Sequence, residues 1–173
     1  MANSIKLKTY VDIVKEKVAA AAFYPGSLLY LNSSGTVAKH AAAGQPAAAL
    51  FALEDSLQGK KISEAYAAAD QVQVLFAVPG EEVYAILNDG QNVAIGDYLE
   101  SAGNGYLQKY VADTEDAESS NEVQPAFTVY SRNIVAMALE AVNLSESSGA
   151  ESSGEGAIDA SLGYSRRIKV CIV

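Results

Sequence analysis

The sequence predicts a mainly β protein, a small β-barrel or sandwich with a duplicated β unit, an extended N-terminal arm and at most one or two short helices. Three observations carry this prediction. Short apolar runs rich in Val, Leu, Ile and Tyr are bounded by turns of Gly, Asn and Asp. Apolar and charged residues alternate near the N-terminus. A pattern in the first half of the chain also returns in the second half.

The predicted organisation is an N-terminal arm over residues 1–22, followed by a single β domain over residues 23–173 that holds two related units. With 173 residues, half of them hydrophobic, the chain is long enough to bury a core. Of the net charge of −9, residues 111–160 account for all, with ten acidic residues against Arg132. The absence of a Lys/Arg cluster argues against nucleic acid as a partner, and the absence of a long apolar run argues against a membrane.

The N-terminal arm has a period of two. Ile5 and Leu7 alternate with Lys6 and Lys8, and no acidic residue occurs in the first ten positions. This pattern suits a strand that is added to the edge of a sheet. We therefore expect Ile5, Lys6, Leu7, Lys8 and Tyr10 to contact a partner subunit or a second copy of the chain. The alternative is that this strand completes the chain's own barrel.

The duplication is clearest in residues 25–37 and 95–107. Each segment predicts a strand, a glycine-centred turn and a second short strand, at a constant offset of 70. Gly26 then matches Gly96, and Gly35 matches Gly105. The pair Asn104-Gly105 predicts a two-residue type I′ hairpin, in which both turn residues have positive φ.

The match continues at larger offsets. Residues 49–54 match 135–140 at an offset of 86, and residues 72–76 match 168–172 at an offset of 96. The related units are therefore 25–76 and 95–173. The growing offset predicts longer connections in the second unit, as acidic loop insertions at about 111–127 and 143–163, because loops tolerate changes of length better than strands do.

A few further elements complete the prediction. Residues 82–87 predict a strand between the two units, and residues 10–22 fit a strand about as well as a helix. Residues 61–69 predict a short helix. The single cysteine, Cys171, lies in an apolar C-terminal strand, where a buried structural thiol is expected.

The sequence predicts no catalytic, cofactor-binding or metal site, and hence a protein that is not an enzyme. His40, the single histidine, lies in an alanine-rich loop and is expected to be solvated. The carboxylates at Asp113, Glu115, Asp116 and Glu118 lack the glycine and the distal glutamate of an EF-hand loop. Motifs of serine hydrolases, P-loop proteins, thiol oxidoreductases and zinc proteases are also missing from the sequence.

The second unit resembles the bacteriophage capsid cement (head decoration and stabilisation) family. The segments that carry this resemblance are residues 83–87, 89–101, 103–107, 135–141 and 166–170, with residues 51–55 and 57–60 in the first unit. It covers nearly the whole chain and rests on patterned strands and turns.

The resemblance implies a structural virion protein, made in the host cytoplasm, that binds the outer surface of the phage head. Its expected partners are the major capsid protein, whose neighbouring subunits it would clamp, and further copies of itself, with a trimer favoured over a dimer. Ile5, Lys6, Leu7, Lys8 and Tyr10 would then be capsid or oligomer contacts. A carbohydrate-binding β-sandwich and a head-fibre-type adsorption module remain alternatives, whereas the chain is short for a major capsid protein.

Overall fold

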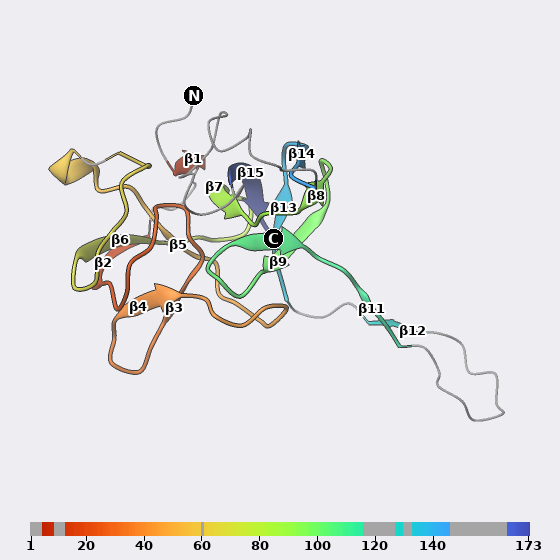
Figure 1. Ribbon diagram of the computed structural model, residues 1–173, viewed down its shortest axis with the longest axis horizontal. Coiled ribbons are helices and arrows are strands. Elements are labelled where there is room, and N and C mark those ends of the chain that lie inside the picture. Colours follow the sequence, from red (N-terminus) through yellow and green to blue (C-terminus); the bar gives the residue numbers. More distant parts are fainter. Residues whose placement is uncertain (1–4, 9–12, 60, 116–126, 130–132, 146–165) are drawn as a thin grey trace.

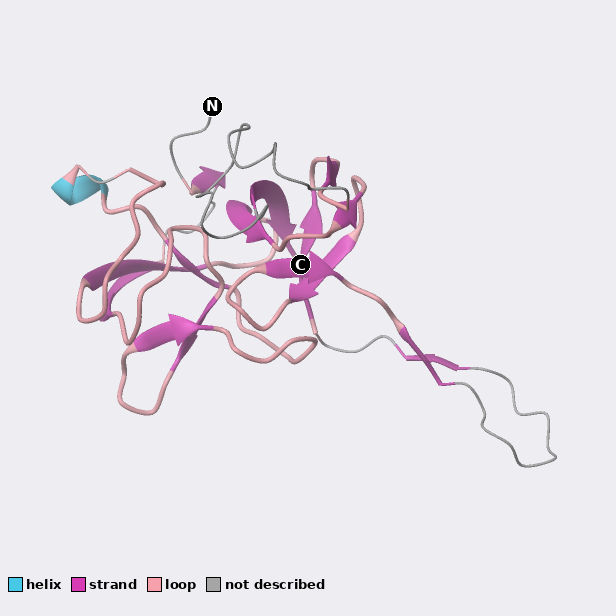
Figure 2. Ribbon diagram, viewed as in Figure 1, coloured by secondary structure: helices cyan, strands magenta, loops and turns pink. Residues whose placement is uncertain are grey.

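The computed structural model describes residues 5–8, 13–59, 61–115, 127–129, 133–145 and 166–173. The predicted mainly β fold with a small barrel is confirmed. Within the described ranges the single helical element is a 3-10 turn, η1 (Ser56–Gln58), and strands and connecting loops make up the rest (Figure 2).

The second half of the chain forms a closed five-stranded barrel, here called the C-terminal barrel. Its strands are β7 (Glu82–Leu87), β9 (Tyr98–Ser101), β10 (Leu107–Lys109), β13 (Ile134–Ala138) and β15 (Arg166–Ile172). The order around the barrel is β7-β10-β9-β13-β15, and β15 pairs again with β7. All neighbours are antiparallel except β7 and β10.

The first half of the chain forms a matching ring, here called the N-terminal barrel. Its strands are β2 (Val14–Val18), β3 (Leu29–Leu31), β4 (Val37–Lys39), β5 (Leu50–Ala52) and β6 (Gln71–Phe76). A three-stranded sheet, β2-β6-β5, and the hairpin β3-β4 are joined by two single bridges, Leu28 to Phe51 and Ala19 to Val37. The ring therefore has the same strand order as the C-terminal barrel.

The two barrels share their strand register. The offsets of 70, 86 and 96 found in the sequence recur in the paired positions, and the first strands, β2 and β7, add an offset of 68. The corresponding pairs include Leu29–Lys39 with Leu99–Lys109, Ala52–Val74 with Ala138–Val170, Val14–Leu75 with Glu82–Cys171, and Leu28–Phe51 with Tyr98–Met137. Each repeating unit thus includes one more strand than predicted: β2 precedes residue 25, and β7 precedes residue 95.

The predicted arm over residues 1–22 is therefore wrong in its extent. Residues 14–18 form β2 and pair along their full length with β6, so they belong to the first barrel. The sequence left strand and helix open for residues 10–22, and the described part of that segment is a strand. Lys15 and Glu16 on its two faces are both exposed, while Ala19, just after the strand, is buried.

Five short strands lie outside the two rings: β1 (Lys6–Lys8), β8 (Asn92–Val93), β11 (Asp113–Glu115), β12 (Phe127–Val129) and β14 (Val142–Asn143). Strands β8 and β14 pair with each other, as do β11 and β12. The β11–β12 ribbon extends away from the barrels (Figure 1). The insertion expected at 111–127 thus begins as a two-stranded ribbon, while 116–126 and most of 143–163 lie outside the described residues.

Two local predictions are wrong. The β9–β10 connection is not a two-residue type I′ turn, because Ala102 donates its amide to Tyr106 O (2.9 Å) across a longer loop. Gly103 and Gly105 supply the positive φ values of that loop. The helix expected over residues 61–69 is absent, and this segment makes turns that bury Ile62 and Tyr66.

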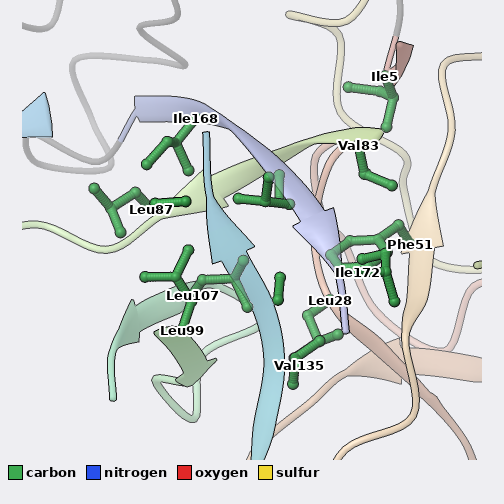
Figure 3. Close-up of a cluster of buried hydrophobic side chains, with 14 of the residues drawn as sticks. Ile5, Leu28, Phe51, Val83, Leu87, Leu99, Leu107, Val135, Ile168 and Ile172 are labelled. Carbon is green, nitrogen blue, oxygen red and sulfur yellow. The ribbon is translucent and has the colours of Figure 1, made fainter. Parts of the chain in front are cut away.

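The buried side chains form one cluster inside the N-terminal barrel, a larger one in the C-terminal barrel and a small one at Ile86 and Tyr106. The larger cluster continues beyond its own barrel. It includes Leu28, Phe51 and Leu75 of the N-terminal barrel, of which Leu28 and Phe51 are labelled in Figure 3. A shared apolar seam therefore joins the two barrels into one body.

Candidate interaction surface

The seam between the barrels shows how one barrel of this chain binds another. Leu28, Phe51 and Leu75 are exposed by no more than 1%. In Figure 3, Leu28 and Phe51 lie beside Val135 and Ile172 of the C-terminal barrel. Burial of such side chains stabilises a contact by about 1.5–3 kcal/mol each. The apolar core of the seam therefore has the character of a protein interior.

Backbone groups of the two barrels also bond directly across the seam. Ile86 donates its amide to Gly26 O (3.1 Å), and Leu28 donates to Gly105 O (2.7 Å). Gly26 has φ +90°, and a Cβ atom at this position would lie 2.8 Å from Tyr84 O. The chain thus needs glycine here both for its conformation and for the close approach of β7.

Arg167 is a buried cation within the seam. Its guanidinium donates to Pro25 O through Nε (3.2 Å) and Nη2 (2.9 Å), and Nη2 also donates to Ile62 O. Burial lowers the pKa of Arg167 to about 10, against the opposing influence of Tyr84 and Tyr106. The side chain is therefore charged at neutral pH, and it ties β15 to two loops of the N-terminal barrel.

His40 lies at the polar rim of the seam. Its Nδ1 is 2.7 Å from Ser101 Oγ, and its amide donates to Leu28 O (3.0 Å). Gly44 donates its amide to Ser101 O (2.9 Å), and Asn133 Nδ2 donates to Gly44 O. The histidine expected to be a solvated loop residue is therefore half-buried, and its ring contacts the second barrel at Ser101.

The N-terminal contact residues expected from the sequence lie partly within the chain's own fold. Strand β1 pairs with β7, and Ile5 is fully buried in the larger cluster. The Ile5 amide donates to Glu54 Oε2 (2.9 Å), and Ile5 O accepts from the Tyr84 amide (2.8 Å). The expectation that Ile5 contacts a partner is therefore wrong, and the alternative of an intramolecular strand describes residues 5–8. Lys6 is half-buried, whereas the Leu7 and Lys8 side chains and Tyr10 lie outside the described set.

A surface that the sequence reasoning missed lies on the C-terminal barrel. Three of its apolar side chains are widely exposed: Ile95 (70%), Tyr98 (47%) and Val111 (74%). Met137 and Cys171 beside them are half-buried, so Cys171 is less covered than expected. The signal was present in the repeat, because Ile95 and Tyr98 stand at the positions of Pro25 and Leu28.

The described residues offer little for chemistry on a ligand. Among them, no group of three or more His, Cys, Asp or Glu side chains is placed to hold a metal ion. A polar groove of about 480 Å³ is lined by Gln91, Asn92, Glu100, Gln108, Lys109 and Val111. No helix in the described ranges is long and apolar enough to span a membrane.

The fold defines a tandem β-barrel protein in which a buried seam joins the two barrels. No known family model matches the chain, and no curated protein sequence matches it.

Proposed function

We propose that this chain is a structural virion protein, a capsid cement protein that binds the outer surface of a phage head and stabilises contacts between major capsid protein subunits. One observation carries the proposal. The main segments with the family resemblance, 83–87, 89–101, 103–107, 135–141 and 166–170, contain all of β9, most of β7, β13 and β15, and the first residue of β10. The resemblance therefore follows the strands of the closed barrel.

The construction of the molecule supports a mechanical role. A clamp must hold its shape while it spans two neighbouring subunits. The seam provides such stiffness through the buried Phe51, the Arg167 bonds and the direct backbone bonds at Gly26. Lys6, on β1, is half-buried and is the described lysine of the N-terminal segment that the sequence assigned to capsid contact.

Binding to assembled heads tests the proposal. Purified protein is added to expanded heads that were assembled without it, and bound protein and the melting temperature of the particles are measured. We expect saturable binding and a higher melting temperature. Binding to free capsid subunits but not to heads would refute the proposal, because a clamp recognises a site formed between neighbours.

A matched pair of variants adds detail. We expect Lys6→Gln to weaken head binding more at low salt than at high salt, since attraction to capsid carboxylates is screened. Lys169→Gln, at an exposed lysine on β15, is the control and should bind as the parent does. Equal loss in both variants would show only a general effect of charge.

One observation favours the carbohydrate-binding alternative. A shallow hollow of about 210 Å³ is lined by Tyr30, His40, Ala41 and Ala42, and Tyr30 is 40% exposed. An exposed aromatic ring in a hollow is what such a module requires. Titration with a panel of host glycans, repeated with Tyr30→Ala, tests this. Glycan binding that the variant abolishes would establish the alternative.

A further inference from the structure

We infer that the C-terminal barrel of one copy docks on the N-terminal barrel of a second copy, by the same contact that joins the two barrels within a chain. The inference does not depend on the proposed capsid role. It rests on the duplication. The seam joins one surface of the N-terminal barrel to a different surface of the C-terminal barrel, and each barrel has the equivalents of both surfaces. Within one chain, each barrel uses only one of its two surfaces.

The first half is here called the docking face. On the N-terminal barrel this face is covered by the other barrel and consists of Pro25, Gly26, Leu28, Phe51 and Leu75, all buried. The equivalent positions on the C-terminal barrel are Ile95, Gly96, Tyr98, Met137 and Cys171, which are exposed or half-buried. These residues remain largely apolar, although Ile95 and Tyr98 are 70% and 47% exposed. An exposed apolar patch of this kind marks an interaction surface.

The second half is here called the receiving face. On the C-terminal barrel it consists of Tyr84, Ile86, Gly105, Tyr106 and Arg167, and all five are buried. The equivalent positions on the N-terminal barrel are Glu16, Val18, Gly35, Thr36 and Gln71, which are exposed or half-buried. The exposed docking face thus lies on the C-terminal barrel, and the exposed receiving face lies on the N-terminal barrel.

The backbone of β2 matches this arrangement. Phe76 donates its amide to Ile13 O (2.9 Å), so the odd-numbered residues of β2 direct their backbone amides toward β6. The amide of Val18, an even-numbered residue, therefore points away from β6. Its equivalent, the Ile86 amide, bonds to Gly26 O across the seam. On this side of β2, the Ala20 amide donates to Val37 O of β4 (2.8 Å) at the C-terminal end of the strand, and the Val18 amide faces the same side, as the Ile86 amide does in β7. We assign Gly96 O of the second copy as the acceptor for the Val18 amide.

The glycines show that room exists for this approach. Added Cβ atoms at Gly26 and Gly105 would each meet an atom of the other barrel at 2.8 Å. At the equivalent Gly96 and Gly35, no atom lies within 4 Å of such a Cβ. The space that the other barrel occupies at the first pair is thus open at the second pair.

The docking and receiving faces are different surfaces, so the contact is head-to-tail. Such contacts close into rings or extend as filaments, unlike a two-fold contact that uses one patch twice. A second copy is the occupant that fits best, because the receiving face it offers has the same strand order and register as the one used internally, with Glu16, Thr36 and Gln71 in place of Tyr84, Tyr106 and Arg167.

Two variants separate the faces. Tyr98→Glu places a charge in the docking face. Val18→Pro removes the receiving amide, and an edge strand tolerates proline where the amide points away from the ladder. Light scattering coupled to size exclusion should show the parent as an oligomer and each variant as a monomer of 18.1 kDa. Mixing the two variants should give a species of about twice that mass and nothing larger, since one intact contact remains.

The control is Ile13→Lys, at an exposed position whose equivalent, Glu81, bonds within its own turn. This variant should form the parent oligomer. Circular dichroism checks the fold of each variant. If the proline unfolds the chain, Leu31→Lys replaces Val18→Pro, because Leu31 is the exposed equivalent of Ser101, which bonds to His40 and Gly44 across the seam. A parent that stays monomeric at all concentrations, a receiving-face variant that still assembles alone, or a mixture that fails to pair would each overturn the inference.

Discussion

Gly26 and Gly96 give the sharpest test of the seam, because they are equivalent in backbone and opposite in surroundings. Their φ values are +90° and +89°. Replacing either by alanine forces a Cβ into the left-handed region at about 1–2 kcal/mol. At Gly26 the new Cβ also meets Tyr84 O at 2.8 Å, where the atom in the way is backbone and has no rotamer by which to move.

The extra destabilisation at Gly26 follows from two effects. Overpacking a buried contact costs about 1–3 kcal/mol, and weakening the Ile86–Gly26 hydrogen bond about 1 kcal/mol more. We therefore expect Gly26→Ala to lower the free energy of unfolding by about 2–4 kcal/mol more than Gly96→Ala does.

Urea unfolding followed by circular dichroism measures this difference, in dilute protein that light scattering shows to be monomeric. Unchanged m-values would show that both variants unfold the same surface. Equal losses of stability in the two variants would refute the reasoning, because they would show that β7 does not approach Gly26 closely in solution.

Three further predictions concern single side chains. Ile5→Ala should lower the free energy of unfolding by about 2–5 kcal/mol in urea titrations, because the side chain is fully buried; an unchanged midpoint would return residues 5–8 to the role of a free arm. Burial raises the pKa of Tyr66 above its ordinary value of 10.0, so its contribution to stability is intact below pH 10 and is lost as the pH rises further. In an ultraviolet titration, the parent should show one phenol that ionises only when alkaline pH unfolds the protein. That phenol should be missing from the titration of Tyr66→Phe. The hydrogen bond from Lys109 lowers the pKa of Asp97. Asp97→Asn should therefore lower the free energy of unfolding by about 0.2–1 kcal/mol above pH 3.8, and the difference in stability between parent and variant should disappear as the pH falls below that value.

The sequence was sufficient for the strands and for their repetition. Strand residues 82–87 were predicted with their observed bounds, and the offsets of 70, 86 and 96 recur in the strand pairs. These features are local, since they depend on alternation and on glycine turns whose spacing is visible in the chain. The offset between β2 and β7 was missed because the Val-Lys-Glu-Lys-Val strand and the more apolar β7 share little composition.

The seam was not predictable in the same way. Alternation assigns a residue to the outer face of a strand, but it does not say what covers that face. Leu28 and Tyr98 occupy equivalent outer positions, and only the fold shows that one is buried and the other 47% exposed. The position of β1 failed for a related reason, since an alternating strand fits any open sheet edge and β7 offered one within the chain.

Divergence between the two units gives a final argument about the surfaces. Inside the barrels the paired positions stay similar, as in Leu29 with Leu99 and Ala52 with Ala138. On the receiving face the buried Tyr84, Tyr106 and Arg167 of the C-terminal barrel are matched by Glu16, Thr36 and Gln71, which are polar and exposed or half-buried. On the outer face of the C-terminal barrel, Ile95, Tyr98 and Met137 are instead apolar, although Ile95 and Tyr98 are 70% and 47% exposed. Their retained apolar character is the reason to look for a second copy there.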